Sequence, residues 1–153
     1  MNNHELQKKF SEQWKGYGSD PDLKLIQLRY QKIRNVIEAE GCGKKILDIG
    51  CADGALIAPL VPHHEVWGIE ISDYLCNEAK KQGLKVIQAD IEEGIPVNSN
   101  TFDIVIAAEI IEHIVDTDFF LAECNRILKK KWETHPLYPK YKHALFTVHY
   151  GII

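Results

Sequence analysis

The sequence has 153 residues, of which 45% are hydrophobic and 26% are charged, and these proportions are ordinary for a globular protein. Its length suits one domain, spanning 1–153, that buries its own core. The formal net charge of −4 offers no basic surface to nucleic acid or to an anionic membrane. We therefore expect small-molecule ligands, with no nucleic-acid and no membrane partner.

Two helices are predicted within residues 1–42, ahead of the first strand. The first has apolar residues at spacings of three and four, which is typical of an amphipathic helix, namely Leu6, Phe10, Trp14 and Tyr17. The second starts at Asp20-Pro21, an N-cap followed by a proline at the first helical position, and ends near Gly41. Its core stripe is Leu23, Ile26, Tyr30, Ile33 and Ile37.

Strands and helices alternate through residues 45–130. Apolar runs predict strands at 45–50, 65–70, 84–89 and 102–108. Helices are predicted at about 54–61, 72–82 and 117–130, with Ser72 as an N-cap, Gly83 as a C′ glycine and Pro59 shortening the first. This order predicts a doubly wound, mostly parallel sheet that binds its ligand beyond the carboxyl ends of the strands.

The cysteines give no sign of a metal site or of a disulfide framework. Cys42, Cys51, Cys76 and Cys124 lack the paired short spacings of zinc ligands. The first residues are polar, and no apolar run approaches the length of a membrane span. We expect free thiols, no metal and a cytoplasmic protein.

A tight glycine turn, 50–54, follows the first predicted strand. Glycine lets the backbone approach a ligand where a side chain would block it. Glu70 ends the next strand, and a carboxylate there suits the two hydroxyls of a ribose. A dinucleotide fingerprint has a second glycine where this chain has Ala52, which weakens the case for a bound pyrophosphate. The turn predicts a nucleoside cofactor, with a purely structural turn as the alternative.

Residues 45 to about 130 resemble the class I S-adenosylmethionine-dependent methyltransferases, in the small-molecule branch that includes the ubiquinone-type enzymes. The family's first motif, acid-x-Gly-x-Gly-x-Gly, is matched by Asp48, Gly50 and Gly54, with Ala52 at the middle glycine. Segments 68–72 and 88–91 are similar to the second and third motifs, and the stretch 102–129 is similar to the family's fourth-strand region. The resemblance implies a Rossmann-like fold that uses S-adenosyl-L-methionine and releases S-adenosyl-L-homocysteine.

The resemblance also implies cofactor contacts: Glu70 takes the ribose hydroxyls, and Asp90 with Ile91 flanks the adenine. From the chemistry of the residues we expect Asp48 to hold the methionine ammonium, directly or through water, and the backbone N–H groups of 50–53 to face the methionine carboxylate. A sulfonium cation favours an acidic, aromatic-lined pocket, so we expect Tyr17 or Trp14 to lie over it. The full set of expected cofactor-binding residues is Asp48, Gly50, Cys51, Ala52, Gly54, Glu70, Ile71, Asp90, Ile91, Glu109 and Tyr17. The alternatives are structural: Asp90 is a simple cap, Cys51 is a small turn residue, and Tyr17 and Trp14 are core residues.

His113 is the predicted catalytic residue. Methyl transfer from a sulfonium needs alignment and exclusion of water, and an oxygen acceptor also needs a general base. His113 follows the fourth strand on the ligand side, with Glu109 and Glu112 as neighbours. The alternative is that it only organises the loop.

After Lys129 the sequence departs from the family pattern. The expected Pro-Gly-Gly and fifth strand are absent, and the tail 131–153 is divergent, so the sheet is expected to be incomplete relative to the family's seven strands. Strand 102–108 would then be an exposed edge. Either 144–150 pairs with it or a second copy of the chain does, and we expect a homodimer or strand exchange through this edge.

Three hypotheses follow. The first is an S-adenosylmethionine-dependent methyltransferase acting on a small-molecule or sugar-like acceptor. The second is a truncated, inactive protein that binds cofactor or partners only. The third, a nicotinamide-dependent oxidoreductase, is disfavoured because Ala52 stands at the second glycine position.

Overall fold

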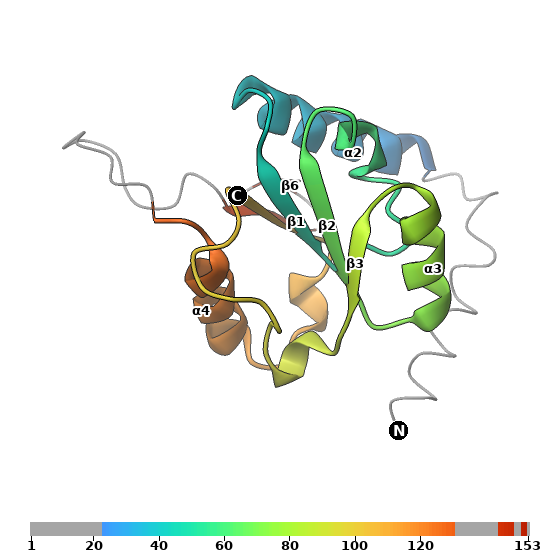
Figure 1. The fold of residues 1–153 in the computed structure, drawn as a ribbon. Helices are drawn as coiled ribbons and strands as arrows, with labels where there is room; N and C mark the ends of the chain where they lie inside the picture. Colours follow the sequence, from blue (N-terminus) through green and yellow to red (C-terminus); the bar gives the residue numbers. More distant parts are fainter. Residues whose placement is uncertain (1–22, 131–143, 149–150, 153) are drawn as a thin grey trace.

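A computed structural model describes residues 23–130, 144–148 and 151–152, and it shows an α/β fold built on a six-stranded sheet (Figure 1). The strand order is β3-β2-β1-β4-β5-β6. β1 to β5 pair in parallel, and β6 is antiparallel to β5. The strands are β1 Lys45–Ile49, β2 Glu65–Glu70, β3 Lys85–Gln88, β4 Ile104–Ala108, β5 Ala144–Val148 and β6 Gly151–Ile152. The predicted doubly wound, mostly parallel sheet is confirmed.

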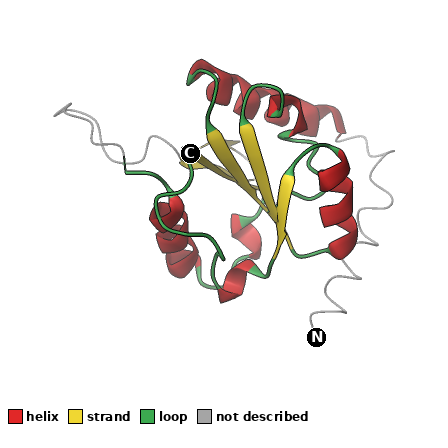
Figure 2. Cartoon of the chain, viewed as in Figure 1, coloured by secondary structure: helices red, strands yellow, loops and turns green. Residues whose placement is uncertain are grey.

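The helices of the described residues are α2 Leu23–Ala39, α3 Asp73–Lys81 and α4 Thr117–Ile127, with short 3-10 turns η2 Ala58–Leu60, η3 Ile91–Glu93 and η4 Ile111–His113 (Figure 2). Ser72 caps α3 as predicted, because its hydroxyl accepts a hydrogen bond from the N–H of Leu75 at 3.4 Å. Gly83 follows α3 with φ +91°. The predicted helix over 54–61 is wrong in extent: Pro59 sits in the three-residue turn η2 instead.

The sheet has a packed apolar layer on each face. One layer joins α2, η2 and α3 to the sheet through residues that include Ile33, Ile37, Leu60, Ala79, Ile46 and Ile106. The other joins α4 and the loop before β4 to the sheet through residues that include Phe120, Cys124, Ile127, Ile95, Leu47 and Val105. Successive residues of β1 and β4 alternate between the two layers, as side chains of a strand do.

The edge of β4 is covered within the chain. Val105 to Ala108 pair in parallel with Ala144 to Thr147 of β5. Of the two alternatives for this edge, the C-terminal strand takes the position, so the alternative of pairing with 144–150 is the one observed and the 102–108 edge is not exposed. This edge of β4 is therefore closed to a second copy of the chain.

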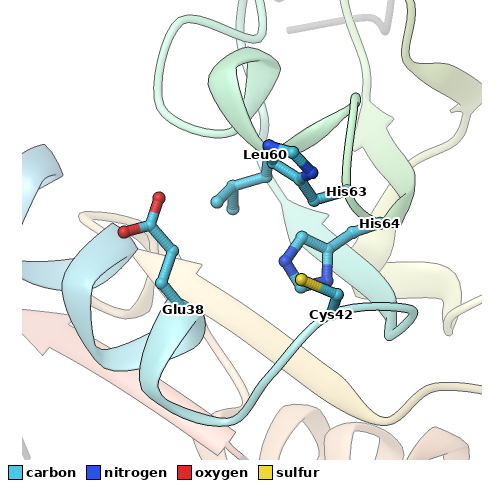
Figure 3. Close-up of a pocket in the computed structure, with 5 residues that line it drawn as sticks. All are labelled: Glu38, Cys42, Leu60, His63 and His64. Carbon is cyan, nitrogen blue, oxygen red and sulfur yellow. The ribbon is translucent and has the colours of Figure 1, made fainter.

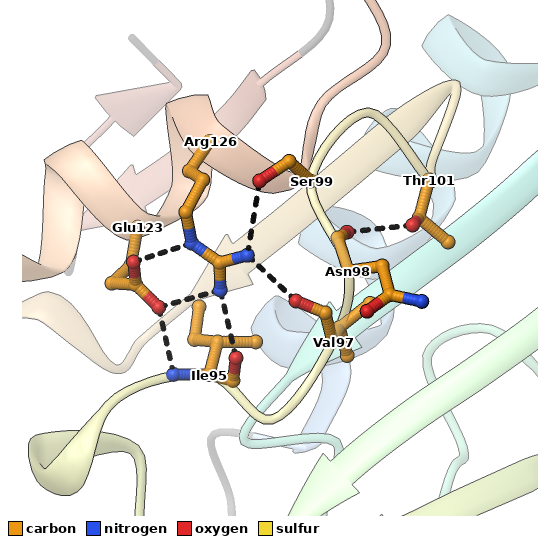
Figure 4. A network of polar contacts seen from close by, with 7 residues as sticks. All are labelled: Ile95, Val97, Asn98, Ser99, Thr101, Glu123 and Arg126. Carbon is orange, nitrogen blue, oxygen red and sulfur yellow. Dashed lines mark hydrogen bonds and ion pairs between the residues drawn. The ribbon is translucent and has the colours of Figure 1, made fainter.

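One polar network fixes α4 to the loop that leads into β4 (Figure 4). The Arg126 guanidinium donates to the carbonyls of Val97 at 2.7 Å and Ile95 at 2.8 Å. It also pairs with Glu123 at 2.6 and 2.7 Å, and Glu123 accepts the N–H of Ile95. The planar guanidinium thus meets several acceptors of one loop at once.

All four cysteines are free, in agreement with the sequence-based prediction. Within the described ranges, no helix combines the length and the apolar character that crossing a bilayer requires. The first predicted helix, with Trp14 and Tyr17, and the cap at Asp20-Pro21 lie outside the described residues.

Candidate functional site

The sheet reverses its winding between β1 and β4, which are neighbours although the chain visits β2 and β3 between them. Open α/β sheets bind ligands at such a switch point, beyond the carboxyl ends of the strands. The glycine turn 50–54 leaves β1 at this point. The predicted site therefore lies where the topology favours one.

The turn depends on its two glycines. Gly50 has φ +73° and Gly54 has φ +85°, conformations that other residues rarely adopt. A Cβ on Gly50 would also lie 2.8 Å from Cδ1 of Ile110, beyond β4. Ala52 has φ +48°, which is uncommon for a residue with a Cβ. The turn therefore has three residues with positive φ within five positions.

The N–H groups of this turn are largely engaged by the protein itself. Gly50 and Cys51 both donate to the carbonyl of Ile69, at 2.9 and 3.0 Å. Ala52 donates to Oε2 of Glu70 at 3.1 Å. The expectation that the N–H groups of 50–53 all face a ligand carboxylate is wrong in this structure, because three of the four have protein acceptors.

Glu70 is a buried carboxylate, 8% exposed, held by backbone donors on both oxygens. Oε1 accepts the N–H of Ser72 at 2.8 Å and Oε2 accepts that of Ala52. Burial raises the pKa of Glu70, and these N–H groups oppose the rise. A carboxylate oxygen has two acceptor positions, so each one still has capacity for a ligand hydroxyl. The geometry fixes the carboxylate against the glycine turn.

Asp48 lies next to Glu70, near the carboxyl end of the inner strand β1. In the register, Asp48 stands opposite Gly68 of β2 and Ile106 of β4, and it is 2% exposed. Burial, and then the charge of Glu70, raise the pKa of Asp48 to about 8. Two acidic groups thus share the low-dielectric end of β1 and β2.

Cys51 does not have the character of a nucleophile. It is buried within the turn, and burial together with the charges of Asp48 and Glu70 raises the pKa of its thiol. Reactive cysteines are thiolates with a lowered pKa. Cys51 is a small residue that fills the turn.

Asp90 and Ile91 follow β3 and lie at the carboxyl ends of the strands, as Glu70 does. The N–H of Ala89 donates to the carbonyl of Glu70 at 3.1 Å, which joins the two strand ends. Asp90 caps η3 by accepting the N–H of Glu92 at 3.0 Å, so the capping alternative is observed. Ile91 is half-buried and packs against the core layer that contains α4. Adenine contact by either residue stays a prediction.

Glu109 lies beyond the end of β4 and pairs with a residue that sequence reasoning missed. Its carboxylate is 3.2 Å from the Arg29 guanidinium of α2, and both side chains are about a third exposed. Glu109 has φ +56°, a second strained non-glycine conformation at this edge. The pairing could not be predicted, because Arg29 is 80 residues away in the chain and the sequence pattern of α2 identifies only the apolar face of the helix.

His113 ends η4 and is exposed. The side chain of Glu112, its predicted neighbour, lies outside the described part of the chain, as does Tyr17. The structure thus brings together Asp48, Glu70 and the glycine turn. It leaves the catalytic role of His113 as a prediction.

Two cavities lie away from the glycine turn. One of about 250 Å³ is lined by Glu38, Cys42, Leu60, His63 and His64 (Figure 3), and it opens at the amino ends of β1 and β2. The other, of about 200 Å³, lies between η3 and the start of α4. Among the described residues, no cluster of three or more histidine, cysteine or acidic side chains has the geometry of a metal site.

The family is decided by comparison with known proteins. A family model described as a methyltransferase domain matches residues 47–131. The chain belongs to the methyltransferase domain family. The matched segment contains the glycine turn, Glu70, Asp90 and His113, so the methyltransferase domain includes the site described above, and the nicotinamide alternative loses its support.

Curated relatives of this methyltransferase domain include the ubiquinone biosynthesis O-methyltransferases of Rhizobium johnstonii and Coxiella burnetii. The first is 33% identical over 93 residues, covering 57% of this chain and 38% of that protein. The second is 30% identical over 123 residues, covering 76% of this chain and 52% of that protein. The chain therefore spans about half the length of these relatives, or less.

Solved structures show the same fold. An S-adenosylmethionine-dependent methyltransferase from Mesorhizobium loti matches with a TM-score of 0.62 at 16% identity, covering 76% of this chain and 51% of that one. The [4+2]-cyclase SpnF matches with a TM-score of 0.58 at 22% identity, covering 67% and 42%. Because a cyclase shares the fold, the reaction has to be argued from the site.

Proposed function

We propose that the chain binds S-adenosyl-L-methionine at the glycine turn and transfers its methyl group to a small-molecule acceptor. The proposal rests on the position of Glu70. It is a buried carboxylate at the end of β2, oriented by two backbone N–H groups against a turn that excludes side chains. A carboxylate so placed is suited to two adjacent ribose hydroxyls.

The other site residues take roles around that anchor. Asp48 receives the methionine ammonium, and Asp90 with Ile91 bounds the adenine. His113 and Glu109 lie beyond β4, on the side where an acceptor would meet the methyl group. An acceptor hydroxyl would lose its proton to His113, a contribution of roughly 10²–10⁴-fold.

The acceptor class is inferred from charge and from the relatives' names. The chain has a net charge of −4, which disfavours polyanions. The curated relatives are named for ubiquinone biosynthesis and O-methylation. We propose a small hydroxylated acceptor, with sugar-like molecules within that class, and a cytoplasmic location, in keeping with four free cysteines.

A turnover assay tests the proposal. The full chain is incubated with methyl-labelled S-adenosyl-L-methionine and a panel of phenols, catechols and hydroxylated small molecules. We expect labelled product and S-adenosyl-L-homocysteine with at least one acceptor. Glu70→Gln replaces one of two acceptor oxygens by an NH2 group, which cannot accept from the backbone N–H or from a ribose hydroxyl. We therefore expect cofactor affinity to fall by tenfold or more.

The matched control is Glu65→Gln, at the exposed start of the same strand. It should bind and turn over like the wild-type chain. Cofactor binding with no product from any acceptor would favour the inactive, cofactor-binding alternative. Equal cofactor affinity in Glu70→Gln and wild type would remove the ribose role of Glu70.

A further inference from the structure

Asp48 has an environment that a charged carboxylate does not tolerate well. It is 2% exposed, and within the described residues its side chain makes no hydrogen bond and no ion pair. Its strand neighbours in the register are Gly68 and Ile106, which supply no side-chain donor. An unpaired charge buried in this way costs several kcal/mol, and such a group tends to stay neutral.

The groups around Asp48 increase that cost. Glu70 on β2 is the charged neighbour, and it is already engaged by two N–H groups. Cys51 on the turn and Cys76 on α3, whose thiol donates to the Glu70 carbonyl at 3.4 Å, supply no positive charge. The Arg29 guanidinium on α2 is directed to Glu109. The cluster is acidic and holds no cation among the described residues.

We propose that Asp48 carries a proton in the free protein and releases it to solvent when the ammonium group of the cofactor binds beside it. The inference rests on the proposed function, since it concerns the same site. No bond to the ligand forms or breaks. The carboxyl proton passes to the buffer, and the resulting carboxylate pairs with the ammonium.

The consequence is a cofactor affinity that depends on pH. Burial, and then Glu70, raise the pKa of Asp48 in the free protein to about 8, and a bound cation lowers it again. Below about pH 8, binding must therefore displace a proton. The affinity rises by up to tenfold for each pH unit between about 6 and 7.5.

Calorimetry on the full chain tests the inference. S-adenosyl-L-homocysteine is titrated at pH 6.5 in buffers of different ionisation enthalpy, which counts the protons released. We expect close to one proton per bound ligand, and roughly tenfold tighter binding at pH 7 than at pH 6. 5′-Methylthioadenosine, the same nucleoside without the amino acid, should release no proton.

The variant Asp48→Asn should bind with an affinity that is flat between pH 6 and 7.5 and should release no proton. Asp118→Asn, an exposed carboxylate on α4, is the matched control and should keep the wild-type proton release. Wild-type binding without proton release, or equal release with 5′-methylthioadenosine, would overturn the inference and leave the proposed function standing. No binding of S-adenosyl-L-homocysteine across the pH range would overturn both.

Discussion

Gly68 has no room for a side chain, and this fixes how closely the glycine turn approaches β2. A Cβ at this position would lie 2.3 Å from Sγ of Cys51 and 2.9 Å from its Cβ. The φ of Gly68 is not positive, so space, and not backbone conformation, requires the glycine. Close packing of Cys51 on Gly68 thus lets the turn lie directly against β2, the strand that carries Glu70.

Gly68→Ala should therefore lower the free energy of unfolding, by about 1–3 kcal/mol, as overpacked core positions do. Urea denaturation followed by circular dichroism measures the change. In the double variant with Cys51→Ala the sulfur is gone and the Cβ contact remains, so part of the loss should be recovered. Full additivity of the two changes would show that the clash is not with Cys51.

At the scale of residues, the sequence was informative where chemistry is local. Glu70 ends the apolar strand β2, and Asp48 lies one residue before the end of β1, so each carboxylate stands out from its apolar neighbours. The pairing of Arg29 with Glu109 joins residues 80 positions apart, and nothing in either local pattern marks it. The use of the turn's N–H groups by Ile69 and Glu70 was likewise hidden, because it depends on how the turn folds back on β2.

At the scale of elements, strands and most helices were predictable because apolar runs and caps are local signals. β2 and the cap of α3 match their predicted positions. The predicted helix over 54–61 was wrong because Pro59 and the positive φ of Gly54 favour turns over a regular helix. The predicted strand at 144–150 forms as β5 and pairs with β4, which is one of the two alternatives that the sequence left open. The sequence could not decide between them, since pairing is determined by the whole sheet.

Arg126 makes the polar contacts that join α4 to the loop before β4. Arg126→Ala leaves the carbonyls of Ile95 and Val97 without this donor and leaves Glu123 without its cationic partner. We expect a loss of about 1–2 kcal/mol in the free energy of unfolding, since the group is partly exposed. Chemical denaturation measures it, and Asn125→Ala, exposed on the same helix, is the control.

Arg126→Lys should be nearly as destabilised as Arg126→Ala, because an ammonium cannot reach both carbonyls and the carboxylate in the plane of a guanidinium. Wild-type stability in the lysine variant would mean that charge alone, and not the fork of donors, holds the loop.

At the scale of the whole molecule, the sheet places the switch point, the glycine turn and two buried carboxylates at one edge. The helices cover both faces (Figure 1), so this edge is the place where a ligand meets strand ends without displacing core side chains. The chain belongs to the methyltransferase domain family over residues 47–131. We propose that the carboxyl end of the sheet is a site for a methionine nucleoside.

Calorimetric titration of the full chain with S-adenosyl-L-homocysteine, in parallel with NAD, is the sharpest test of this site. We expect saturable binding of S-adenosyl-L-homocysteine with one site per chain, and no measurable binding of NAD at the same concentrations. NAD binding more tightly than S-adenosyl-L-homocysteine, or no binding of S-adenosyl-L-homocysteine by the folded chain, would show that the site does not take a methionine nucleoside.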